Sequence, residues 1–371
     1  FGGEQFGRRV GVRVDERRRI GRDEFGRRNQ QWWQRRKQRG RRIVVGWGRQ
    51  RSVEFRGGLF RGREQFGAVE RGGEFGYVER RLTRVSRMPA EIPWGEMMFY
   101  RLHTDGTRQD VDLGNMLTGP LRTACWIVGG GPSLSELPHE SIARSPAAKL
   151  AINLGGARLI RPTLWTSYDP TARFHRSVYL DASIWKFVHA RRAMDLVPET
   201  TFKVCECPGV LCFDREPQRG FADFLPAQPA GVVDWNDSFV QAIEIAYRLG
   251  FRMLYLAGCD FHVRPSSAQL ERATAAGVEY ASRELLGEFF DRCAAKGISR
   301  DEIERLEPPT QYHFDERKPL AAAIQTDLHY FRVSQYLRLC RRALSLAGIE
   351  LASVTPESRL NDYFLSVPAA D

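Results

Sequence analysis

Short apolar segments alternate with longer amphipathic segments from about residue 120 onward. A short apolar run is typical of a buried strand, and apolar residues that recur every three or four positions predict a helix. The predicted strands are 123–128, 149–153, 163–168, 186–189, 202–206, 252–257 and 350–354. The predicted helices are 136–144, 239–249, 267–296 and 319–346. This alternation predicts an α/β domain whose mostly parallel sheet carries helices on both faces.

Polar side chains mark the beginnings of two predicted helices. The pair Asp237-Ser238 is expected to cap the helix that follows it, because short oxygen-bearing side chains accept hydrogen bonds from the first free N–H groups. Ser133 or Ser135 is expected to do the same for the first helix.

Ligands of parallel sheets bind where the strands end. The predicted strand ends are 129–134, Asn153, Asp169, 258–262 and 355–359. The first of these reads Gly-Gly-Gly-Pro-Ser-Leu, and its glycines allow a sharp turn and a close approach to a ligand. It is neither a P-loop, since no Gly-Lys-Ser/Thr follows, nor the complete Gly-x-Gly-x-x-Gly fingerprint. It predicts either a phosphate-binding loop before a helix or a tight strand-to-helix turn.

Basic charge is concentrated in the first 87 residues. This segment contains 25 of the 56 Lys and Arg residues but 10 of the 45 Asp and Glu residues, so its net charge is +15 and that of 88–371 is −4. It also holds 16 of the 34 glycines and lacks Pro, Cys, His and Met. Such a low-complexity segment cannot bury enough apolar surface to offset the entropy lost on ordering. The mildly acidic remainder gives no support for a nucleic-acid-binding enzyme.

Three interpretations of residues 1–87 are open. The segment is an Arg/Gly arm that binds RNA, a disordered tail, or an upstream extension of the reading frame before a true start at Met88. We divide the chain accordingly into this tail, an N-terminal lead-in at 88–119, and an α/β domain at 120–368.

Several classes of protein are excluded by composition. The sequence contains no run of 18 apolar residues, so it predicts no membrane-spanning helix. The Arg-rich start is not a secretory signal. Seven cysteines are too few for a disulfide scaffold, so we expect a cytoplasmic protein. Cys205, Cys207 and Cys212 lack a fourth zinc ligand at the usual spacing, although His189 is available, and we expect no metal there.

Four motifs occur in an order that resembles one known group of proteins. They are the glycine loop at 129–134, Asn153, the block 237–260, and Thr-Pro-Glu-Ser-Arg-Leu-Asn at 355–361. The pattern is similar to that of the DUF115-type group, which holds MptE-like 6-hydroxymethylpterin diphosphokinases and flagellin-glycosylation accessory proteins, and to that of related Campylobacter-type sialyltransferases. The resemblance implies a Rossmann-like fold and a glycine loop that contacts a nucleotide.

The resemblance transfers residue by residue. Asn153 keeps the asparagine that follows the second strand, whereas Gly130 stands where sialyltransferases carry a loop asparagine. His262 replaces a tyrosine of the family. Ala322 occupies the position of the family's general-base histidine, and His313 or His329 could replace that histidine in space.

The resemblance and the strand ends together give the expected site residues. Nucleotide contacts are expected from Gly129, Gly130, Gly131, Pro132, Ser133, Asn153, Asp169 and Ser358. The catalytic candidates are His262, Asp260 and His329, because a histidine of near-neutral pKa can take a proton from an acceptor hydroxyl.

Each candidate also has a purely structural interpretation. His262 could be a loop histidine bonded to Asp260, and Asp260 could cap the next element. Asp169 could start a turn, Asn153 could tie a loop to the backbone, and His329 could be an ordinary packed or surface side chain.

The expected function is a nucleotide-dependent transferase, with a nucleotide-sugar donor and a surface-glycan acceptor. One alternative is an MptE-like diphosphokinase that transfers pyrophosphate from ATP to a pterin-like alcohol, with Mg²⁺ on Asp169 and Asp260. Another is a non-catalytic nucleotide-binding or scaffold protein, which Ala322 and Gly130 permit. In each case the expected partner is a small molecule. Binding of nucleic acid is expected only if residues 1–87 form an RNA-binding arm.

Overall fold

A computed structural model describes most of the chain beyond residue 97. The described residues are 98–111, 113, 123–153, 155–218, 220–221, 224–225, 231–306, 310–311, 313 and 316–367. The chain divides into two units, 1–84 and 85–371, and all the described residues belong to the second. The interpretations of residues 1–87, and much of the lead-in at 88–119, therefore lie outside the described part.

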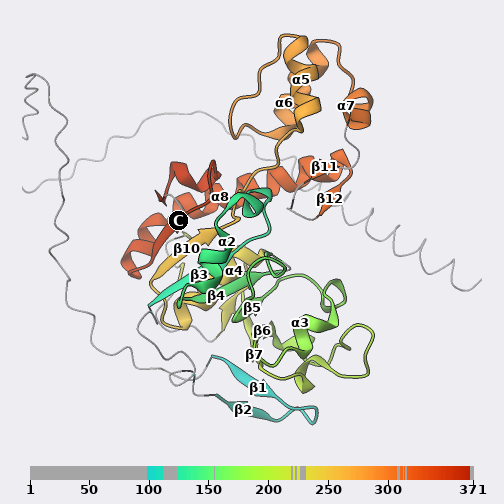
Figure 1. The fold of residues 1–371 in the computed structure, drawn as a ribbon. Coiled ribbons are helices and arrows are strands. Elements are labelled where there is room, and N and C mark those ends of the chain that lie inside the picture. The colour runs from blue at the N-terminus through green and yellow to red at the C-terminus, as the bar shows by residue number, and fades with distance from the viewer. Residues whose placement is uncertain are drawn as a thin grey trace, which may run out of the picture. The chain divides into compact units, whose positions relative to one another are not determined.

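The core of the second unit is a ten-stranded sheet (Figure 1). Its strands are β1 (Tyr100–Leu102), β2 (Arg108–Asp110), β3 (Ala124–Val128), β4 (Ala148–Ile152), β5 (Leu164–Thr166), β6 (Trp185–His189), β7 (Val210–Phe213), β10 (Met253–Ala257), β13 (Glu350–Ser353) and β14 (Leu365–Ser366). Their order is β14-β13-β10-β3-β4-β5-β6-β7-β1-β2. The eight strands from β14 to β7 are parallel, and β1 and β2 add an antiparallel pair at one edge. The mostly parallel sheet predicted from the sequence is confirmed.

The order of the strands reverses beside β3. From β3, the chain builds β4, β5, β6 and β7 on one side and returns to add β10, β13 and β14 on the other. The connections that leave β3 and β10 therefore diverge toward opposite edges of the sheet. In open parallel sheets, this divergence is where ligands bind.

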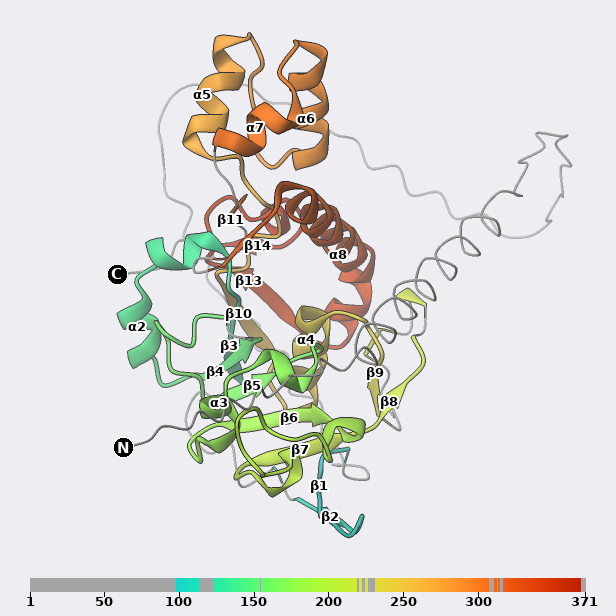
Figure 2. The ribbon, with the colours of Figure 1, turned by 90° about the vertical axis from the view of Figure 1, so that its right-hand side faces the viewer.

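Helical segments cover both faces of the sheet (Figure 2). Side chains alternate between the faces along a strand. Ile127 and Leu256 pack on one side, where α4 (Ser238–Arg248) and α8 (Leu320–Leu346) supply the covering apolar residues. Their neighbours Val128 and Ala257 pack on the other side, against η1 (Pro132–Glu136) and α2 (His139–Arg144). Among the described helices, none combines the length and apolar character needed to cross a membrane.

Three short helices form a small lobe with its own core. They are α5 (Ser267–Ala275), α6 (Leu286–Ala295) and α7 (Arg300–Leu306), and they group together in Figure 1. Phe289 and Phe290 are buried at the centre of this lobe, and Leu320 and Ala323 of α8 belong to the same cluster. The lobe is thereby packed onto the first turns of α8.

The structure corrects three predicted elements. The helix predicted at 267–296 is two helices, α5 and α6, and Gly277 follows the end of α5 with a φ of +74°. The strand predicted at 202–206 is wrong, because η4 (Val204–Glu206) is a 3₁₀ turn and β7 begins only after Gly209, whose φ is +64°. The helix predicted at 136–144 is divided into η1 and α2.

Cap predictions had mixed outcomes. Asp237 caps α4 as predicted, since its Oδ1 accepts hydrogen bonds from the N–H groups of Phe239 and Val240 at 2.9 Å each. Neither Ser133 nor Ser135 is the N-cap of η1 or α2. The Ser133 hydroxyl instead donates to Oδ2 of Asp260. The strands β1, β2 and β14 were not predicted, because segments of two or three residues carry too short a hydrophobic pattern.

Candidate functional site

A pocket of about 370 Å³ lies at the carboxyl ends of the central strands. It is lined by residues that follow β3, β4, β5 and β10, by the start of α4, and by the first half of α8. His313 and Lys318 complete the wall; Lys318 belongs to β12 (Arg317–Lys318), which pairs with β11 (Thr310–Gln311). The volume is within the usual range for small-molecule sites.

The glycine loop packs tightly against the end of β10. Gly129 and Gly131 donate backbone hydrogen bonds to the carbonyls of Ala257 and Gly258, each 2.8 Å long. A Cβ at Gly131 would lie 1.7 Å from Oδ2 of Asp260, and a Cβ at Gly129 would lie 2.4 Å from the Gly258 oxygen. These two glycines are therefore required by the close approach of the two loops.

Gly130 is the most open residue of the loop. A Cβ there would meet nothing nearer than 3.4 Å. Its N–H has no hydrogen-bond partner among the described residues. Gly130 thus offers the pocket both a free donor and room.

Asp260 holds the loop from behind. Its Oδ2 accepts a hydrogen bond of 2.8 Å from the Ser133 hydroxyl, and its Oδ1 accepts one of 3.3 Å from the Ser133 N–H. Burial raises the pKa of Asp260 to about 6, although the bonds from Ser133 oppose this shift. Asp260 belongs to the pocket lining, but both oxygens of its carboxyl are bonded to Ser133 and support the loop.

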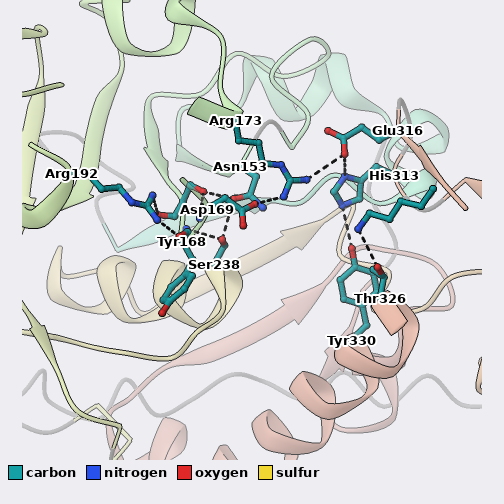
Figure 3. A network of polar contacts seen from close by, with 12 residues as sticks. Asn153, Tyr168, Asp169, Arg173, Arg192, Ser238, His313, Glu316, Thr326 and Tyr330 are labelled. Carbon is teal, nitrogen blue, oxygen red and sulfur yellow. Dashed lines mark hydrogen bonds and ion pairs between the residues drawn. The ribbon is translucent and has the colours of Figure 1, made fainter. Parts of the chain in front are cut away.

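Asn153 presents an amide donor to the pocket. Its Oδ1 accepts hydrogen bonds from the hydroxyls of Ser167, at 2.6 Å, and Ser238, at 3.0 Å. These contacts hold the amide so that its Nδ2 has no partner in the described part of the chain. Figure 3 shows Asn153 at the centre of this polar cluster. A fixed, unpaired amide donor on a pocket wall is suited to a phosphate or sugar oxygen.

Three residues that line this pocket have a left-handed backbone. Asn153, Asn236 and Phe261 have φ values of 58°, 53° and 57°. Asparagine adopts this conformation readily, whereas it is costly for phenylalanine and is held only by surrounding structure. Backbone strain in the lining is therefore expected at Phe261.

His329 forms a dyad with Asp237 at the pocket wall. Its Nε2 lies 3.0 Å from Oδ2 of Asp237. The hydrogen bond to Asp237 raises the pKa of His329 above its ordinary value, and burial opposes that shift. The side chain remains 47% exposed, so a substrate can reach it. The carboxylate fixes one ring nitrogen and leaves the other to exchange a proton.

His262 differs from His329 in every respect that matters for proton transfer. Its Nδ1 donates to the carbonyl of Asp260 at 2.9 Å, and its Nε2 accepts from Nε of Arg264 at 2.8 Å. The side chain is buried, and burial lowers the pKa of His262 to about 4. Both ring nitrogens are occupied in a neutral ring. This geometry supports the structural interpretation of His262.

Further polar contacts run along the pocket wall from Asp169 to Tyr330 (Figure 3). Arg173 Nη1 lies 2.6 Å from Asp169, and its Nη2 lies 3.5 Å from Glu316. Glu316 is also 3.5 Å from Nδ1 of His313, whose Nε2 is 3.2 Å from the Tyr330 hydroxyl. The network joins the end of β5 to α8 through the β11–β12 hairpin.

Positive charge also reaches this wall from β12. Lys318 Nζ donates to the Thr326 hydroxyl at 3.1 Å, and both residues line the pocket. Burial and the nearby Arg173 lower the pKa of Lys318. Two cationic side chains therefore lie on one wall of the pocket.

Most of the residues predicted from the sequence meet at the pocket. It is lined by Gly129, Gly130, Gly131, Asn153, Asp169, Asp260, His262 and His329. Ser358 is not in the lining, because its buried hydroxyl donates to the Cys259 carbonyl at 2.6 Å and caps η6 (Arg359–Asp362). Pro132 and Ser133 belong to the glycine loop but are also outside the lining. Ala322 does not reach the pocket, but both His313 and His329 do.

Several contributors were missed by sequence reasoning. Arg173 had a weak signal, since it follows Asp169 by four residues and such pairs often interact. Lys318 and Tyr330 had none. Asp237 was predicted only as a helix cap. Its contact with His329 joins two residues that are 92 positions apart in the sequence, so local patterns do not predict it.

Metal ligands are scarce in the described structure. No group of three or more His, Cys, Asp or Glu side chains there could hold a metal ion. Asp169 is paired with Arg173, and the Asp260 carboxyl accepts from Ser133. Cys205, Cys207 and Cys212 are free thiols.

We compared the chain with models of protein families, with curated proteins and with solved structures, and none of the three comparisons found a match. The family resemblance drawn from motif order therefore stays a prediction.

Proposed function

We propose that this chain is a nucleotide-dependent transferase of the glycosyltransferase kind, with a Rossmann-like nucleotide-binding domain. The observation that carries the proposal is the pairing, in one pocket, of a fixed amide donor on Asn153 with a carboxylate-oriented histidine, His329. The donor substrate is a nucleotide sugar, and the acceptor is a hydroxyl of a surface glycan.

The nucleotide phosphate is bound near the divergence of β3 and β10. The N–H of Gly130 and the Nδ2 of Asn153 are donors without partners in the described structure. Arg173 and Lys318 add positive charge to the same pocket. Donors and cations aimed at the leaving phosphate stabilise the negative charge that develops on it during transfer.

His329 is the general base of the transfer. With its Nε2 proton donated to Asp237, the neutral ring keeps a lone pair on Nδ1. That nitrogen takes the proton of the acceptor hydroxyl as the oxygen bonds to the anomeric carbon. The bond from that carbon to the phosphate oxygen breaks, and the nucleotide leaves with the electron pair. His329 is a stronger base than His262, because the pKa of His329 is raised and that of His262 is lowered.

The diphosphokinase alternative has less support. That reaction requires Mg²⁺, which needs accessible carboxylate oxygens. The two carboxylates considered for it, Asp169 and Asp260, are engaged by Arg173 and Ser133. The geometry therefore favours proton transfer by a histidine over metal-assisted phosphoryl chemistry.

The test is the release of free nucleotide from CMP-sialic acid and from UDP- and GDP-sugars, with water as the acceptor. His329→Gln in the full chain is expected to lower this release about 100-fold or more, the usual contribution of a general base. His103→Gln, on the exposed turn after β1, is the matched control and is expected to keep full activity. Equal activity in both variants would refute the role of His329. If a nucleotide sugar binds but no free nucleotide is released, the proposed transferase activity is refuted and a nucleotide-binding scaffold is the better description.

A further inference from the structure

The second half of α8 carries basic charge that nothing described neutralises. Residues 332–346 include Arg332, Arg338, Arg341 and Arg342 and no acidic residue. None of the four has a carboxylate within ion-pair distance in the described structure, and only Arg338 contacts a ring, that of Tyr363, at 5.8 Å. This concentration of positive charge stands out, because residues 88–371 have a net charge of −4.

Two leucines stand among these arginines. Leu339 is 51% exposed and Leu346 is 78% exposed. At about 100° per residue, they lie within about 20° of each other around the helix, with Arg332 and Arg342 on either side. We call Arg332, Arg338, Leu339, Arg342 and Leu346 the α8 outer face.

The opposite side of α8 explains the orientation of this face. Val333, Leu337, Cys340 and Leu344 are buried in the main core. They fix the rotation of the helix, so the α8 outer face is directed away from the sheet. One face of α8 therefore packs in the core. The solvent-facing side carries both exposed leucines and arginines, so it combines apolar and basic character.

We propose that the α8 outer face docks on an anionic membrane surface. Exposed leucines can enter the boundary between headgroups and acyl chains, and the surrounding arginines can pair with lipid phosphates. A nucleic acid would use the arginines but would leave the two leucines in water. Residues 1–87 of the chain carry a net charge of +15 and would be repelled by this face. The inference is independent of the reaction carried out in the pocket.

The test must separate this face from the basic residues 1–87, which can also bind anionic lipid. Leu346→Cys in the full chain is labelled with an environment-sensitive fluorophore and mixed with vesicles of phosphatidylcholine and phosphatidylglycerol at 3:1. We expect a blue shift and an intensity rise with these vesicles and none with pure phosphatidylcholine. The unchanged chain, labelled in the same way, gives the background from native thiols. Leu196→Cys, at another exposed leucine outside α8, is the matched control and is expected to stay silent.

A second variant tests the charges. Arg338→Gln combined with Arg342→Gln is expected to weaken the response at position 346 about 25-fold, at roughly fivefold for each arginine. A silent probe at 346 while the chain sediments with vesicles would overturn the proposal and assign binding to residues 1–87. An equal response at 196 and 346 would also overturn it. A fluorescence response of the probe at position 346 to an RNA oligonucleotide, but not to vesicles, would overturn the proposal and identify nucleic acid as the partner of this face.

Discussion

Oδ2 of Asp237 lies 3.0 Å from Nε2 of His329, while Oδ1 of the same carboxylate accepts the hydrogen bonds that cap α4. One side chain therefore fixes both the start of a core helix and the orientation of the proposed base. The cap needs only an acceptor oxygen, whereas the pKa of His329 depends on negative charge. The two roles can be separated by a single substitution.

Asp237→Asn is expected to keep the helix and change the histidine. Asparagine caps helices about as well as aspartate, so the free energy of unfolding should change by less than about 1 kcal/mol. The pKa of His329 should fall, because the hydrogen bond that its ring donates to the charged carboxylate is the main cause of the raised value. NMR titration of the imidazole signals measures this directly. In activity assays, the acid limb of the pH profile should move to lower pH, because a base of lower pKa stays deprotonated in more acidic solution. An unchanged histidine titration would contradict the dyad.

The buried carboxyl of Asp260 is expected to make stability fall as pH rises. Its pKa is about 6 in the folded protein and 3.8 as the reference, so the folded state binds the proton more tightly. The stabilising contribution is complete below about pH 4 and is lost as pH rises through 6, a change of about 3 kcal/mol. Urea unfolding from pH 4 to 7.5, compared between the unchanged chain and Asp260→Asn, isolates this term. A difference that stays flat or grows with pH would show that Asp260 titrates normally.

Two neighbouring glycines should respond differently to a methyl group. Gly131→Ala places a Cβ where Oδ2 of Asp260 now lies, and we expect a loss of about 3 kcal/mol of stability. Gly130→Ala has room and should cost less than about 1 kcal/mol. Chemical denaturation of both variants provides the comparison. Similar costs at the two positions would mean that the loop is not packed against β10 as described.

Arg359 is expected to be among the most sensitive positions away from the pocket. It is 4% exposed, and its guanidinium pairs with Asp327 at 2.9 Å while also bonding the carbonyls of Phe261 and Glu284. Arg359→Met leaves a buried carboxylate without its partner and should cost about 3 to 5 kcal/mol. The control is Arg272→Met, which removes a more exposed pair with Glu302 and should cost about 1 kcal/mol or less. Thermal unfolding of both decides the matter, and a small effect at Arg359 would count against the buried pair.

The parts of the fold that could be predicted are those governed by local chemistry. The strands β3 and β10 are short apolar runs with glycines directly after them, so both their existence and their ends were visible. Asp237 was predicted as a cap because capping involves only the next three residues. The strand predicted at 202–206 was wrong because hydrogen bonds from the backbone of Val204 and Cys205 to Asp195 and Ala193 bend that segment into a turn.

The candidate site was less predictable because its geometry is made by distant residues. Asn153 could be named from its place after β4, but the hydroxyl of Ser238 that orients its amide comes from another element. Ser358 was expected in the pocket because it follows β13, yet its hydroxyl is turned to the Cys259 carbonyl. Which way a side chain points at a strand end depends on tertiary contacts that spacing does not contain.

Nucleotide binding at this pocket can be measured by isothermal titration of the full chain with CMP, UDP, GDP and ATP. The proteins compared are the unchanged chain, Asn153→Asp and Asn236→Asp. Aspartate at 153 keeps the acceptor for Ser167 and Ser238 and removes the amide donor. Asn236 lines the same pocket with a similar φ, so its variant controls for the added charge. We expect one nucleotide to bind, Asn153→Asp to weaken that binding about 100-fold, and Asn236→Asp to change it only a few-fold. No binding of any nucleotide by the folded chain, or equal losses in the two variants, would refute nucleotide binding through the Asn153 amide.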